Sequence, residues 1–129
     1  MKKTLVSEAQ ILAADQYLKR YRLHSRLLRL SEYERRKGIA DAPWEASLSR
    51  AELFRIRQFI MSLENCDEKI FLYYYYVRGA SMEECAELLG IARSSIYRLR
   101  PRALSLAALR MQADEESKIN EPSHAMQIG

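Results

Sequence analysis

Residues that interrupt helices are scarce in this chain, whose 129 residues include four glycines and three prolines. Leucine, alanine, glutamate and arginine, which favour helices, are plentiful. This balance predicts an all-α protein, built as one compact domain or as a small domain with appendages. A net charge of +4 is compatible with nucleic acid as a partner but does not require it.

Long apolar runs are also lacking, because the longest, residues 70–77, falls far short of the ~20 residues that span a membrane. The two N-terminal lysines precede only a short apolar stretch, so we expect no secretory signal. Cys66 and Cys85 have no metal-ligand spacing and are predicted to be structural thiols of a reducing compartment. We therefore expect a cytoplasmic protein without a membrane partner.

Catalytic patterns are absent as well. The chain has no Ser/His/Asp set, no metal-ligand cluster and no glycine-rich phosphate loop, and His24 and His124 stand alone. The sequence accordingly predicts a protein that is not an enzyme, with no cofactor and no metal.

Changes in composition divide the chain into three parts. Residues 1–47 are predicted to form a helical basic arm that ends in a linker, GIADAPWEAS at 38–47, in which Trp44 anchors the linker onto the core. Residues 48–112 are predicted to form a helical domain. Residues 113–129 are polar and poor in apolar side chains, which predicts a disordered tail.

The arm shows three stripes at helical spacing. One is basic: Lys19, Arg22, Arg26, Arg29 and Arg36. Two are apolar: Leu23, Leu27 and Leu30, and, roughly opposite, Tyr17, Leu18, Tyr21 and Leu28. Two apolar stripes predict burial on two sides, against the rest of the chain and against a second subunit in a homodimer. Three roles remain open for the basic stripe: solvation, contact with DNA phosphates, or contact with an acidic partner such as RNA polymerase.

The run FLYYYYVRG at 71–79 is predicted to be helical although its aromatics favour a strand. Asn65 and Asp67 are suitable caps at its start, and Gly79 is suited to end it. The helix should be buried on two faces. These faces are Ile70, Phe71, Tyr74 and Val77 on one side and Leu72 and Tyr76 on the other, with Tyr73 and Tyr75 on the flanks.

The segment SMEECAELLGIARSSIYRL at 81–99 carries the pattern of a helix-turn-helix. Ser81 and Glu84 form a capping box, Gly90 serves the turn, and Ala86 is small where the two helices approach. The expected core residues are Cys85, Leu89, Ile91, Ile96 and Leu99. In this motif the second helix lies in the DNA major groove.

Charge supports that interpretation, since residues 91–110 contain five arginines and no acid. Arginine recognises guanine with two hydrogen bonds, and serine contacts bases or phosphates. The predicted DNA-binding residues are Arg93, Ser94, Ser95, Tyr97, Arg98, Arg100 and Arg102.

The stretch LENCDEKIFLYYYYVRGASMEECAELLGIARSSIYRLRPRAL resembles the DNA-binding fourth conserved region of bacterial sigma factors. The resemblance covers about residues 48–110, and small phage and prophage regulators of the ArpU and RinA type are also similar. It implies a sigma-region-4-like helix-turn-helix domain whose residues 93–98 touch promoter DNA.

This chain departs from the family at three places. Ala92 stands where Ser or Thr usually caps the recognition helix, which costs ~1 kcal/mol. Pro101 is expected to kink or end that helix, because it deletes one amide and crowds the carbonyl of Tyr97. Tyr73 and Tyr75 occupy positions that are commonly arginine, and the chain has no room for the sigma region that binds core polymerase.

The sequence thus predicts a sequence-specific transcription regulator that binds double-stranded DNA, encoded by a phage or prophage. Two alternatives remain. One is a protein-interaction module that docks on RNA polymerase or a sigma factor. The other is a DNA-packaging subunit that resembles a small terminase.

Overall fold

The computed structural model describes residues 6–39 and 43–119, and in these ranges every regular element is a helix. The helices are α1 (Glu8–Arg36), α2 (Pro43–Met61), α3 (Asp67–Leu72), the π-helix η1 (Tyr73–Val77), α4 (Met82–Leu89) and α5 (Arg93–Ile119). The predicted all-α class is confirmed. No helix of the described part combines the length and the apolar character that crossing a bilayer requires.

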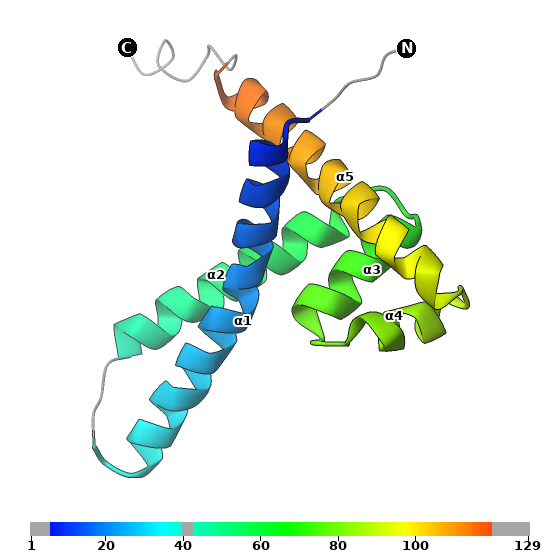
Figure 1. Ribbon diagram of the computed structural model, residues 1–129. Helices are drawn as coiled ribbons and strands as arrows, with labels where there is room; N and C mark the ends of the chain where they lie inside the picture. Colours follow the sequence, from blue (N-terminus) through cyan, green and yellow to red (C-terminus); the bar gives the residue numbers. More distant parts are fainter. Residues whose placement is uncertain (1–5, 40–42, 120–129) are drawn as a thin grey trace, which may run out of the picture.

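Helix α1 organises the molecule by packing against α2 with one half and against α5 with the other (Figure 1). α1 and α2 form an antiparallel hairpin, and Arg20 bonds to Glu52 across it at 2.7 Å. On the other side of α5 lie the short helices α3 and α4. The α1–α2 hairpin therefore extends away from the end of the molecule at which α5 begins.

One hydrophobic core joins all six helices. Leu18 of α1, Ile56 of α2 and Ile96 of α5 are fully buried in it. The sequence assigned residues 1–47 to an arm and expected one of its apolar stripes to pack against the rest of the chain, and the first half of α1 belongs to the same core as the later helices. The cause is the stripe containing Leu18 and Tyr21, whose apolar area is covered by the rest of this chain.

Two predicted boundaries were wrong. Helix α2 begins at Pro43, inside the predicted linker, since proline fits the first position of a helix, where no amide partner is needed. Helix α5 continues to Ile119, so residues 113–119 are helical and not a disordered tail. The rest of that predicted tail, 120–129, and the side chain of Trp44, the predicted anchor, lie outside the described residues.

The other apolar stripe of α1 stays largely exposed in the described part of the chain. Leu23, Leu27 and Leu30 are 49%, 43% and 51% exposed. Of the two apolar stripes predicted to be buried, the described residues bury only the one that contains Leu18. In this stripe Leu18 and Tyr21 are buried, and Tyr17 and Leu28 are half-buried.

The tyrosine run is helical, as predicted, but η1 is a π-helix and not a continuation of α3. The amide of Arg78 donates to the carbonyl of Tyr73 at 3.1 Å, and that of Ala80 donates to Tyr74 at 2.9 Å. Gly79 ends the segment with φ of +75°, as expected. The predicted caps were wrong, because Cys66 precedes α3 and provides no side-chain cap.

The extra residue in each π turn changes where the tyrosines point. Tyr76 turns into the core and is 3% exposed, and Tyr75 stacks on the buried Phe71 at 5.2 Å. Tyr73 and Tyr74 form an edge-to-face pair at 5.3 Å and stay half-buried. The predicted burial of two full faces is only partly correct, since Ile70 is 40% exposed.

The two cysteines differ in accessibility, which predicts a difference in reactivity. Burial, with a contribution from Glu84, raises the pKa of the Cys85 thiol, and Cys85 is 1% exposed. Cys66 is half-buried at the surface. Because the thiolate is the nucleophile, a thiol reagent should label Cys66 first and Cys85 only when the core opens. Mass spectrometry of native Cys66→Ser protein should then show no label until denaturant is added. Equal labelling rates of both thiols in native wild-type protein would contradict this expectation.

Candidate nucleic-acid interface

Helices α4 and α5 are joined by a tight turn that local signals define. The Ser81 hydroxyl accepts from the amide of Glu84 at 3.1 Å, and the Glu84 carboxylate accepts from the amide of Ser81 at 2.8 Å. This is the predicted capping box. Gly90 ends α4 with φ of +69°, a conformation that costs a residue with a Cβ atom roughly 1 kcal/mol.

The inner face of α5 closes the core against α4. Cys85 and Ala86 of α4 are buried against Ile96 and Leu99 of α5, and Leu89 and Ile91 pack at the edge. The predicted core residues of this unit are thus all in contact with the core. Their spacing determines which side of α5 remains outside.

The outer face of the first turns of α5 is open to solvent. We name this surface the α5 outer face and define it as Arg93, Ser94, Tyr97 and Arg98, all of which are exposed. Tyr97 is 57% exposed although it is a large aromatic side chain. Ser95 was predicted with this group, but it is half-buried at the border of the face. Four of the seven predicted contact residues therefore form one continuous exposed surface.

The two arginines of the α5 outer face differ electrostatically. Arg93 pairs with Glu83 of α4, and both side chains are well exposed, at 71% and 60%. An ion pair this exposed contributes little and can be exchanged for a ligand at small cost. Arg98 has no ion-pair partner among the described residues. Its guanidinium, with donors on a planar fork, is available to an anion or a base edge.

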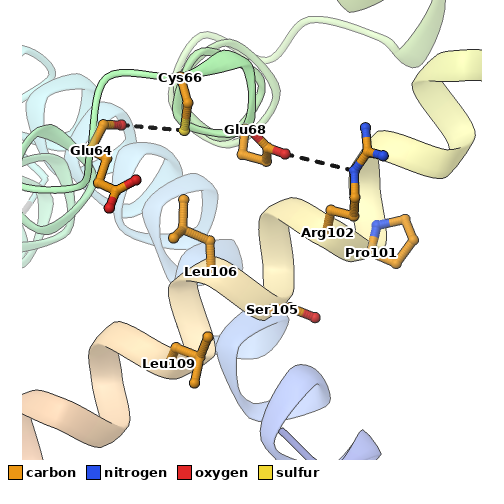
Figure 2. A pocket seen from close by; sticks show the side chains of 8 residues that line it. All are labelled: Glu64, Cys66, Glu68, Pro101, Arg102, Ser105, Leu106 and Leu109. Carbon is orange, nitrogen blue, oxygen red and sulfur yellow. Dashed lines mark hydrogen bonds and ion pairs between the residues drawn. The ribbon is translucent and has the colours of Figure 1, made fainter. Parts of the chain in front are cut away.

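Arg102 lies farther along α5 and faces α3. Its guanidinium is 3.6 Å from the carboxylate of Glu68, and Figure 2 shows this pair at the rim of an open groove of about 460 Å³. Cys66, which precedes α3, and Leu106 of α5 also line the groove. The side chain of Arg102 is 65% exposed, so it remains accessible beside the α5 outer face.

Arg100 does not lie on the α5 outer face, in contrast to the sequence prediction. Its guanidinium turns inward, 3.3 Å from the carboxylate of Asp15 in α1, and lies 5.7 Å from the ring centre of Tyr75. Its Nε atom is buried and has no hydrogen-bond partner in the described part of the chain. Arg100 therefore serves the packing of α1 on α5, and we remove it from the contact residues.

Asp15 and Tyr76 were missed from the sequence, and they explain the position of Arg100. The Tyr76 hydroxyl donates to Asp15 at 2.5 Å, and Lys19 pairs with the same carboxylate at 3.1 Å. Burial, followed by the hydrogen bond to Asp15, raises the pKa of Tyr76 well above its usual value. The one sequence signal for this contact was the position of Asp15, an acidic residue one turn before Leu18 on the apolar side of α1.

Pro101 neither ends α5 nor separates its two halves, because the helix continues from Arg93 to Ile119. The proline is exposed, and its ring lacks the amide that would bond to the carbonyl of Tyr97. Of the two predicted alternatives, a kink or an end of the helix, the end is wrong, because α5 continues past Pro101. The continuous helix joins the α5 outer face to the part of α5 that packs on α1.

Within the described ranges, no three His, Cys, Asp or Glu side chains gather in a way that would hold a metal ion. Comparison of the chain with protein-family models, with curated proteins and with solved structures finds no match.

Proposed function

We propose that this protein binds double-stranded DNA sequence-specifically and regulates transcription, and that α4 and α5 act as a helix-turn-helix. One observation carries the proposal: the inner face of α5 closes the core while its outer face presents Arg93, Ser94, Tyr97 and Arg98 to solvent. A helix held in this way can enter a major groove without rearrangement. The resemblance to sigma region 4 and to phage regulators supports promoter DNA as the target.

Affinity and discrimination come from different groups in this mechanism. Phosphate contacts by basic side chains supply most of the affinity, and they position the protein on the duplex. Arg93 and Arg98 supply discrimination, through paired hydrogen bonds to guanine. Tyr97 adds an aromatic surface for apolar contact with the base edges. Selection of bound fragments from genomic DNA with the purified protein would identify the target sequence.

Replacing Arg98 or Arg93 by alanine should weaken binding to the selected site by about 1–3 kcal/mol and relax discrimination at one base pair. The reason is the loss of a bidentate base contact from the α5 outer face. Arg35→Ala is the matched control, because Arg35 is exposed at the far end of α1. Fluorescence anisotropy with the selected site and with single-base variants measures both effects. Wild-type affinity in both the Arg93 and the Arg98 variant would refute the assignment of the reading face.

A protein-docking function is the second candidate, and the exposed stripe of Leu23, Leu27 and Leu30 is the observation that favours it. Such a stripe is an apolar surface of the kind that a second copy or a polymerase subunit covers. Salt separates the two functions, because binding through several phosphates weakens steeply as salt is added. The mass in solution further distinguishes a monomer or dimer from the ring of a packaging subunit.

A further inference from the structure

A second basic surface lies outside the α5 outer face, between α1 and the segment that leads into α4. It is a cleft of about 330 Å³, lined by Arg22, Arg26 and Arg29 of α1 and by Arg78 at the end of η1. We name it the arginine cleft. The sequence indicated the row on α1, but not that Arg78 joins it from more than forty positions away along the chain.

The electrostatics of the arginine cleft are one-sided. None of its lining residues is acidic, and none of its four arginines has an ion-pair partner among the described residues. Arg57 of α2 adds positive charge behind it, because it donates to the hydroxyl of Tyr21, a lining residue, at 2.7 Å. The carboxylate of Asp15, bonded to the lining residue Tyr76, is already paired with Lys19 and Arg100. Four guanidiniums that line one cleft without a counter-charge give it a positive potential, which favours an anion.

We propose that the arginine cleft binds phosphate groups of the DNA backbone while the α5 outer face reads the bases. This proposal rests on the DNA-binding function proposed above. Arginine suits phosphate because its planar fork donates two parallel hydrogen bonds. Ser25 adds a hydroxyl to the lining. The row from Arg22 to Arg29 extends about 10 Å along α1, the axial length of about three successive phosphates on one strand.

The position of the cleft relative to α5 fits one duplex. The lining residues Arg78 and Gly79 come just before the eight-residue α4 in the chain, and the α5 outer face comes just after it. Figure 1 shows α4 between the segment that precedes it and the start of α5. An α-helix of this length spans about 12 Å, which is also about the width of the major groove. In the proposed complex, the phosphate strand that borders the groove occupied by α5 lies in the arginine cleft.

The test compares two double variants that remove the same charge. The cleft variant, Arg26→Gln with Arg78→Gln, removes one arginine of α1 and the arginine that follows η1. Arg35→Gln with Lys37→Gln removes two exposed cations at the far end of α1. Affinity for the selected site and for a random-sequence duplex is measured over a series of salt concentrations. The plot of log affinity against log salt should become shallower by about 2 for the cleft variant on both duplexes, with the ratio of the two affinities unchanged. The control variant should keep the wild-type slope.

A third measurement distinguishes backbone phosphate from a small phosphate ligand. Inorganic phosphate, added at constant ionic strength, should compete with the duplex for wild-type protein and less for the cleft variant. A wild-type salt slope in the cleft variant overturns the proposal and leaves the DNA-binding function intact. The proposal is also overturned, with the DNA-binding function intact, if phosphate binds the cleft but the double substitution leaves the affinity for the duplex unchanged. If wild-type protein binds no duplex at all, the proposed function itself fails, and the cleft proposal with it.

Discussion

Replacing Phe71 by alanine should lower the free energy of unfolding by about 3–5 kcal/mol. Phe71 of α3 is fully buried in the core to which α1, α2 and α5 also contribute, and its ring stacks on Tyr75. Truncation removes the transfer energy of the ring and leaves a cavity that the surrounding helices fill only in part. Because a domain of this size is stable by only about 5–15 kcal/mol, the loss should be visible as a large shift of the denaturant midpoint.

Phe54 provides the matched control for Phe71. It is the same residue type in the neighbouring helix α2, but it is 59% exposed, so Phe54→Ala should change the free energy of unfolding by no more than about 0.5 kcal/mol. Phe71→Leu, which refills most of the volume, should fall between the two. Urea titrations followed by circular dichroism give all three values. A Phe71→Ala protein as stable as Phe54→Ala would place the core elsewhere than around α3.

The elements that the sequence predicted well are those whose causes lie within a few residues. The capping box of Ser81 and Glu84 acts over three positions, and Gly90 is the residue that the left-handed turn requires. The apolar spacing of Ile96 and Leu99 then determines which side of α5 is inside. For these reasons all four residues of the α5 outer face were among the seven that the sequence predicted, although the half-buried Ser95 was predicted with them.

The elements that the sequence did not predict depend on distant partners. Arg100 belongs to the arginine-rich stretch at residues 93–102, but its side chain points inward because it pairs with Asp15, 85 positions earlier in the chain. Tyr76 meets the same carboxylate across 61 positions, and a π turn places it there. No local pattern carries either contact, because α1 had no predicted position relative to α5.

Helix boundaries failed for a related reason. Residues 43–47 contain a proline and no apolar period, and residues 113–119 contain mainly polar side chains, so both segments were predicted to be irregular. In the structure each one continues a helix whose remainder is fixed in the core, and extending an existing helix avoids the cost of nucleation.

Replacing Asp15 by alanine should lower the free energy of unfolding by about 2–4 kcal/mol. Asp15 is 8% exposed and receives hydrogen bonds from Tyr76 and Arg100, so its removal leaves a buried hydroxyl and a guanidinium without their acceptor. The Arg100 side chain is 34% exposed, so water compensates part of that charge and the loss stays below that of a fully buried pair.

Asp114→Ala is the control for Asp15, because Asp114 also pairs with an arginine, Arg110, but is 55% exposed. Its loss should cost no more than about 0.5 kcal/mol. A double-mutant cycle of Asp15→Ala with Tyr76→Phe then isolates the contact between α1 and η1, and it should give a coupling energy of about 0.5–3 kcal/mol. Strictly additive losses would mean that the two side chains act independently. In that case the hydrogen bond between Tyr76 and Asp15 would make no measurable contribution to stability.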